Sequence, residues 1–277
     1  LPSAPPATFL LSATPIAAMD VRWPLMAVNG SDTHLLEPIA QLVYRGSSTS
    51  DVGITDDDSQ GFVFDDSNLF SYDRFSGIDR QETGLRANLG AHYLGNFGNG
   101  SWLDLVAGES FQLAGANAFD ALDPTLTGTD SGLDSTASYL VAGARAGFTN
   151  GITVGTKVQV DPSAPRVTRA GLGVTWSPGN RFSVGATYVY VAADPTLGLP
   201  SPQHEIAGSV SLPVDDYWTV NGGLTYNIAA TNWIKANAAL TYDDGYFSAG
   251  VFGDFAPTDY TVGIHLKLKG PDGSLAF

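Results

Sequence analysis

The stretch GITVGTKVQV, residues 151–160, alternates apolar and polar side chains. The same alternation runs through residues 181–192 and through YTVGIHLKLK, residues 260–269. Successive side chains of an extended chain point to opposite faces, so a period of two predicts β-strands with one apolar and one polar face. In the first stretch, one face carries Ile152, Val154, Val158 and Val160, and the other carries Thr153, Gly155, Lys157 and Gln159.

The alternation recurs along the chain and predicts about thirteen strands, with no competing helical period. Most of them are about 10 to 14 residues long, whereas strands of globular proteins usually have about 5 or 6. A tilted strand that crosses a bilayer needs about 9 to 11 residues, so these lengths favour a membrane sheet. The predicted strands cover residues 15–27, 34–46, 79–95, 100–113, 135–149, 151–161, 166–177, 181–192, 203–213, 217–228, 231–243, 245–254 and 259–269.

The composition excludes several classes of protein. Only 15% of the 277 residues are charged, below the roughly 25% of a soluble protein. The net charge of −15 argues against a nucleic-acid partner, which needs clusters of Lys and Arg. The chain has no cysteine and its four histidines are scattered. No hydrolase, zinc-protease or P-loop motif occurs, and the acids near residue 58 lack the glutamate that closes a calcium loop. We therefore expect no catalytic residue, no metal site and no cofactor.

The connections between the predicted strands alternate between short turns and long loops. No run of 18 apolar residues occurs, so a membrane protein of this sequence must be a barrel. Short turns on one side and long loops on the other are typical of outer-membrane barrels. Trp102, Trp176 and Trp218 lie beside short turns, where an aromatic girdle would meet the periplasmic interface. The alternative is that tryptophan is simply common in β-sheets.

The predicted strand 79–95 has an unusually polar face. That face carries Arg80, Glu82, Arg86, Asn88 and His92. We expect these side chains to line the water-filled lumen of a wide barrel, because a narrow barrel would have to pack them as ion pairs. The alternative is the solvated face of a soluble sandwich. Thirteen is an odd number of strands, which suggests a fragment of a larger barrel.

Three segments resemble one known family. They are EPIAQLVYR (37–45), DSQGFVFDDSNLFSYDRFSGIDR (58–80) and GLRANLGAHY (84–93), and PIAAMDVRWPL (15–25) agrees with them. They resemble the C-terminal part of the lipopolysaccharide (LPS)-assembly protein family LptD, also called organic solvent tolerance protein. Beyond about residue 110 the resemblance is architectural.

The resemblance implies an all-β fold: an antiparallel transmembrane barrel of about 26 strands in the outer membrane of a Gram-negative bacterium. Residues 1–277 would be its C-terminal portion, without the N-terminal jelly roll and the first barrel strands. It would insert LPS into the outer leaflet through a lateral gate between its first and last strands. Implied partners are LPS, an LptE-type plug lipoprotein, the periplasmic LPS bridge through the missing domain, and outer-membrane lipid. Enteric members form disulfides that this cysteine-free chain cannot form.

Two sets of residues follow from this expectation. The last strand would supply one side of the gate with Tyr260, Val262, Ile264 and Leu266. The long segment 58–80 would be an extracellular loop that folds back and caps the lumen, through Asp58, Phe62, Phe64, Asp65, Asp66, Asn68, Phe70, Arg74 and Phe75. The alternatives are that these are ordinary loop residues, and that the chain is a general diffusion porin or another outer-membrane channel, which has no reason to carry this motif.

Overall fold

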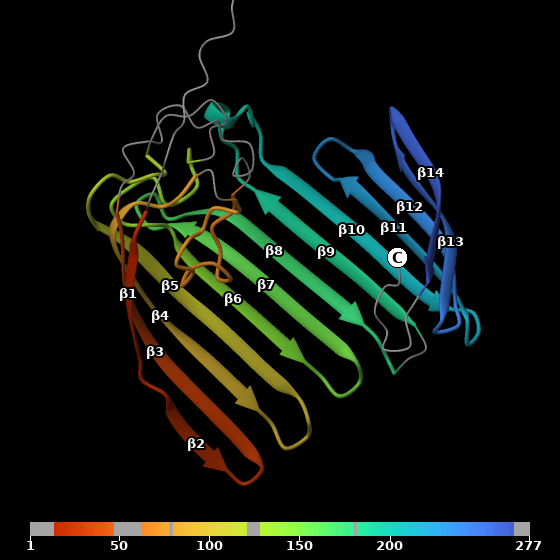
Figure 1. The fold of residues 1–277 in the computed structure, drawn as a ribbon, viewed down its shortest axis with the longest axis horizontal. Coiled ribbons are helices and arrows are strands. Elements are labelled where there is room, and N and C mark those ends of the chain that lie inside the picture. The colour runs from red at the N-terminus through yellow and green to blue at the C-terminus, as the bar shows by residue number, and fades with distance from the viewer. Residues whose placement is uncertain (1–13, 47–61, 78–79, 121–127, 180–181, 269–277) are drawn as a thin grey trace, which may run out of the picture.

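The computed structural model describes residues 14–46, 62–77, 80–120, 128–179 and 182–268. Their dominant feature is one antiparallel sheet of fourteen strands, curved so that its two ends turn away from the plane of the middle strands (Figure 1). The strands are β1 Ile16–Arg22, β2 Leu25–Asn29, β3 Asp32–Arg45, β4 Gly84–Asn96, β5 Trp102–Ala114, β6 Leu140–Gly147, β7 Ile152–Asp161, β8 Arg166–Trp176, β9 Ser183–Val191, β10 Gln203–Pro213, β11 Trp218–Asn227, β12 Asn232–Asp243, β13 Phe247–Ala256 and β14 Asp259–Leu268.

Each strand pairs with the strands that precede and follow it in sequence, apart from one change at the start. β1 and β2 both pair with β3, and β14 is the opposite edge. A 3₁₀ turn, Pro195–Leu197, lies between β9 and β10. Among the described residues, no helix is both long and apolar enough to cross a membrane.

The all-β antiparallel class is confirmed, and the expected bounds of three strands are wrong. The strand expected at 135–149 covers only Leu140–Gly147, because residues 135–139 belong to the connection that precedes it. The strand expected at 15–27 is interrupted at Pro24, whose nitrogen has no hydrogen to donate to β3. This interruption gives fourteen strands instead of thirteen. The strand expected to begin at residue 79 begins at Gly84, which has a φ of +89°. Arg80 and Glu82 therefore lie in the segment before the strand.

The strand register separates the two faces of the sheet by polarity. Val220, Leu240, Val251 and Ile264 lie directly opposite one another across β11–β14. They belong to one face, here called the outer face, on which large apolar side chains are exposed along the sheet. Gln41, Asn88 and Ser110 lie opposite one another on the other face, the inner face. Because so wide an apolar surface is unfavourable in water, the outer face is suited to contact lipid.

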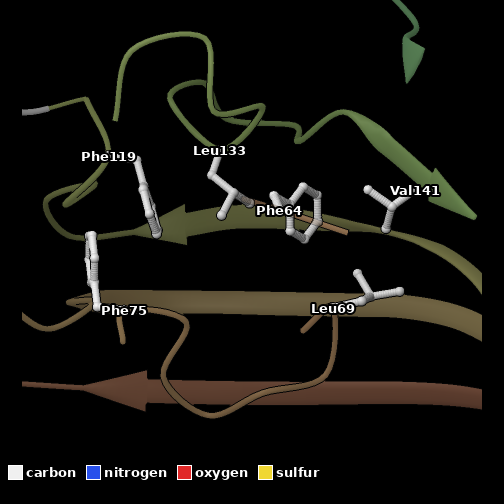
Figure 2. Packing of buried hydrophobic residues seen from close by; sticks show 6 residues of the cluster. All are labelled: Phe64, Leu69, Phe75, Phe119, Leu133 and Val141. Carbon is white, nitrogen blue, oxygen red and sulfur yellow. The ribbon is translucent and has the colours of Figure 1, made fainter. Parts of the chain in front are cut away.

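The buried apolar core is small and lies on the inner face, not between two layers of secondary structure. It consists of Phe64, Leu69, Phe75, Phe119, Leu133 and Val141 (Figure 2). The Phe75 and Phe119 rings stack with their centroids 4.6 Å apart. Only Val141 belongs to a strand, and the others come from the segments 62–77 and 115–139. The core therefore joins two long connections to the sheet.

Candidate functional site

The segment 62–77, here called the folded loop, crosses the inner face over β3–β7 (Figure 1). Side chains of three strands hold its backbone. Gln41 of β3 donates to the carbonyl oxygen of Phe70 across 3.0 Å, and Arg86 of β4 donates to that of Ser71 across 2.7 Å. Gln159 of β7 donates to the carbonyl oxygen of Phe64 across 3.1 Å. The polar inner face therefore supplies donors to a loop that has no regular structure of its own.

Arg74 is the one cation of the folded loop, and its side chain is 1% exposed. Its Nη2 donates to Asn88 Oδ1 across 2.7 Å and to Ser110 Oγ across 3.1 Å. The same nitrogen donates to the carbonyl oxygen of Leu69 across 2.8 Å. The guanidinium also lies 5.2 Å from the centre of the Phe64 ring. Arg74 thus ties the turn of the loop to β4 and β5.

Glu82 lies between two arginines beneath the folded loop. Its Oε2 pairs with Arg74 Nη1 at 3.4 Å and with Arg86 Nη1. Burial lowers the pKa of Arg74 to about 10, against the opposing effect of Glu82. Burial also raises the pKa of Glu82, although both arginines oppose that rise. Breaking one member of such a buried set leaves an uncompensated charge, so the set fixes one position of the loop.

Three glycines allow the folded loop to lie directly on the backbone of the sheet. A Cβ at Gly90 would lie 3.0 Å from the Phe70 ring, and one at Gly108 would lie 2.7 Å from Leu69 Cδ2. A Cβ at Gly143 would collide with the carboxylate of Asp66. Glycine weakens a strand interior and is used there where another part of the chain approaches closely. The loop approaches all three glycines, although a Cβ at Gly90 or Gly108 would come still closer to a carbonyl oxygen of the neighbouring strand.

The tip of the folded loop is a tight polar turn clamped by a lysine. Asp65 Oδ1 accepts a hydrogen bond from the backbone nitrogen of Ser67 at 2.7 Å, which is an Asx turn. Asn68 Nδ2 donates to the carbonyl oxygen of Val63 at 2.7 Å. Lys157 Nζ of β7 donates to Asp65 Oδ2 at 2.7 Å. Burial would raise the pKa of Asp65, but the hydrogen bonds from Lys157 and Ser67 outweigh it and lower that pKa.

The structure brings together most of the residues expected in the loop. Phe62, Phe64, Phe70 and Phe75 belong to the buried core or pack against it. Asp65, Asp66, Asn68 and Arg74 make the contacts given above, and Asp58 lies outside the described residues.

The residues expected to line a lumen lie in three places. Glu82, Arg86 and Asn88 lie beneath the folded loop. Arg80 lies outside the strand, where it donates to the carbonyl oxygen of Ala118 at 2.6 Å. His92 lies farther along the inner face and pairs with Asp104 at 3.0 Å. The residues expected at the gate, Tyr260, Val262, Ile264 and Leu266, share the outer face of the edge strand β14.

Four contributors to the site were not predicted from the sequence. Gln41, Ser110 and Gln159 belong to it through strand register, and Phe119 belongs to it through the second long connection. A signal existed for Gln41, because it interrupts an apolar strand on the face that Ile39 and Val43 share. In the described part of the chain, no group of three His, Cys, Asp or Glu could hold a metal ion.

Comparisons with known proteins give one family and several structures. The family model described as "LptD: LPS transport system D" matches residues 5–248. No curated protein matches the chain. A structure described as "Asymmetric conductivity of engineered proteins" has a TM-score of 0.45 at 12% identity, with 94% of this chain and 82% of that chain covered. A triple mutant of the Rhodopseudomonas blastica porin has a TM-score of 0.43 at 13% identity, with coverage of 92% and 80%.

Proposed function

Because the chain belongs to the LptD family, LPS transport system D, we propose that it is part of an outer-membrane translocon that inserts LPS into the outer leaflet. The observation that carries this proposal is the family match, which runs through most of the chain. The two faces of the sheet support it. An amphipathic lipid with a long saccharide needs an apolar path for its acyl chains and a polar path for its sugars.

The proposed assembly is a closed barrel of about 26 strands, in which residues 1–277 are the C-terminal portion and follow a jelly-roll domain. The unpaired edges of the sheet support the proposal that the barrel contains further strands. Within the described residues β1 and β14 are both edges, and they do not pair with each other. An open sheet edge does not occur in the hydrocarbon region of a bilayer, because each unpaired backbone group costs several kcal/mol there.

The lateral gate is proposed to use the last strand, β14. Tyr260, Val262, Ile264 and Leu266 are strongly exposed on its outer face. In the proposed barrel this strand meets the first strand of the barrel, which lies before residues 1–277, and acyl chains leave between them. A strand whose outer face is already apolar can pass acyl chains to the bilayer without burying a polar side chain.

The inner face is proposed to be the lumen wall, and the folded loop its extracellular cap. The buried arginines and the glycine contacts support the cap, because they hold the loop against the inner face. An LptE-type lipoprotein would occupy the lumen from the periplasm, and the periplasmic LPS bridge would deliver LPS through the N-terminal domain. The proposed activity is transport without a chemical step.

Reconstitution separates this proposal from a diffusion porin. The full-length protein, purified with its LptE-type partner, is inserted into liposomes, and the periplasmic transport proteins supply LPS. One readout is the LPS that reaches the liposome membrane, and the other is swelling of the liposomes in a small sugar. LPS transfer with little swelling supports the translocon. Rapid swelling without LPS transfer contradicts it and supports a porin.

A further inference from the structure

One carboxylate interrupts the apolar outer face of the sheet. Glu109 lies near the middle of β5, and its neighbours in sequence, Gly108 and Ser110, face the folded loop on the inner face. Because side chains alternate along a strand, Glu109 faces outward, directly opposite the exposed Leu89 of β4. No hydrogen bond or ion pair joins its carboxylate to another described residue. Its role therefore lies outside the contacts that hold the folded loop.

Glu109 differs in its position from the other charged residues of the described strands. The strand register places every Lys and Arg of these strands on the inner face, together with all Asp and Glu except Asp32 and Glu109. Asp32 begins β3 beside a turn and accepts a hydrogen bond from the backbone nitrogen of Gly98 at 2.7 Å. Glu109 instead has apolar neighbours on both sides along its strand. The other outward residues of β5 are Leu103, Leu105, Ala107, Phe111 and Leu113.

The depth of Glu109 in the proposed barrel separates it from water and from lipid headgroups. Leu113, four residues farther along β5, is the last outward leucine of the strand. At about 3.4 Å per residue and a tilt of about 40°, Glu109 lies about 10 Å deeper than Leu113. Lysine and arginine can extend to the interface on their long stems, whereas the glutamate side chain is too short. An ionisable group in hydrocarbon is costly unless it has a partner, so Glu109 is expected to have one in the membrane.

Small residues beside Glu109 give another protein room to approach. Ala91, Ala107 and Ala142 lie directly opposite one another across β4, β5 and β6, in the row next to Glu109. Where membrane-embedded helices pack, small residues allow close approach and polar side chains form hydrogen bonds across the interface. The same physical reasons apply to the wall of a barrel. The alanine row indicates an interface here because it borders a carboxylate that lacks a partner.

We propose that the outer face of β4–β6 binds a second outer-membrane protein, which presents a lysine or arginine side chain to Glu109. The cation compensates the carboxylate within the hydrocarbon, and the alanine row accommodates the stem of the cation. A second copy of this chain does not meet the requirement through its described strands, because none of their Lys and Arg residues faces outward. This interface goes beyond LPS transport and depends only on the contact of the outer face with the membrane.

The test places a photoreactive amino acid at Ala91 of the full-length protein in living cells. The matched control position is Ala186, on the outer face of β9 opposite Gly208. We expect Ala91 to cross-link to one outer-membrane protein and Ala186 not to do so. In Glu109→Leu the yield should fall about tenfold, the loss expected for one charged hydrogen bond, whereas Glu109→Asp should retain most of it. Immunoblots of outer membranes verify that each variant is assembled.

The identity of the captured protein decides whether charge complementarity holds the interface. Mass spectrometry locates the cross-link on the partner, and replacement by leucine of the nearest outward lysine or arginine should abolish it. Cross-links that form equally in Glu109→Leu overturn the inference, as does a partner without a basic residue at the cross-link. Adducts with lipid alone at both positions also overturn it, because the outer face of β4–β6 would then contact only the bilayer.

A second measurement uses the purified full-length protein in phospholipid vesicles, where the partner is absent. Glu109→Leu should raise the urea concentration at the midpoint of unfolding, because it removes a carboxylate without a partner from the hydrocarbon. A lower midpoint would show that its own chain stabilises Glu109 and would overturn the inference. Absence of LPS transfer by the wild-type protein in liposomes would reject the proposed function and leave the cross-linking test unaffected.

Discussion

Nη2 of Arg74 lies 2.7 Å from Oδ1 of Asn88, so the folded loop is joined to the sheet by a buried, charge-assisted hydrogen bond. Asn88 in turn donates from Nδ2 to Gln41 and accepts from Ser110 at 2.6 Å. Arg74 is therefore connected through the Asn88 amide to three strands, β3, β4 and β5. The position of the loop depends on this connection more than on its own backbone, which forms no regular element.

Replacement of Arg74 should release the folded loop. In Arg74→Ala, Glu82 stays buried beside one arginine and Asn88 loses a donor. We expect the free energy of opening the loop to fall by about 3 to 5 kcal/mol, as for other broken buried ion pairs. Hydrogen exchange of the amides of residues 62–77 in the purified protein measures this change.

The matched control for Arg74 is Arg22→Ala. Arg22 pairs with Glu37 at 3.1 Å on the edge strand, and its side chain is half exposed. An exposed pair of this kind contributes about 1 kcal/mol or less. Equal exchange rates in the two variants would show that the buried arginine does not hold the loop.

A methyl group at Gly143 should displace the tip of the loop. In Gly143→Ala the added Cβ collides with the Asp66 carboxylate, and the neighbouring Asp65–Lys157 pair is disturbed with it. Gly155→Ala, on the adjacent strand, meets its nearest atom at 3.7 Å and should be neutral. Limited proteolysis within the loop should therefore be faster in the first variant only. Equal proteolysis of both would contradict the direct seating of the loop on the sheet.

Acid should weaken the clamp between Asp65 and Lys157. The pKa of Asp65 is below its ordinary 3.8, because hydrogen bonds from Lys157 and Ser67 outweigh burial. An acid with a lowered folded-state pKa contributes stability that is complete above its unfolded pKa and is lost as the pH falls through the folded pKa. Loop protection should thus drop below about pH 3.8 more steeply in wild type than in Asp65→Asn. Parallel pH profiles of the two proteins would contradict the contribution of Asp65 to the protection of the loop.

Charge should be tolerated on the inner face and not on the outer face. Leu240 is exposed on the outer face of β12, and its sequence neighbour Thr241 faces inward. Leu240→Arg should lower the free energy of unfolding by about 2 to 4 kcal/mol if it lies near the bilayer midplane, because an arginine there leaves water for hydrocarbon. Thr241→Arg should change it little. Urea titrations in lipid vesicles compare the two, and an equal loss in both would contradict the assignment of the faces.

The strands were predictable and the loop contacts were not. Alternation along 151–160 and 260–269 is local, so the sequence predicts strands there to within one or two residues. Pro24 carried a usable signal for the break between β1 and β2, since proline cannot donate to a ladder.

The path of the loop depends on contacts between distant residues. The 2.8 Å hydrogen bond from Arg74 to Leu69 is local, but its bond to Ser110 spans 36 residues and that of Gln159 to Phe64 spans 95. The aromatic residues of 62–75 indicated that the loop would pack against something. Only the register of β3–β7 identifies Gln41, Ser110 and Gln159 as its partners. The pattern of a single sequence does not specify which residues of neighbouring strands lie opposite one another.

The most direct test of LPS transport is depletion of the parent gene in living cells, followed by labelling of newly made LPS at the cell surface. We predict that the new LPS stays in the inner membrane and periplasm as the protein disappears, and that expression of the wild-type gene restores its arrival at the surface. Normal arrival of LPS in depleted cells, together with a fall in small-solute uptake, would contradict this account and identify a diffusion channel.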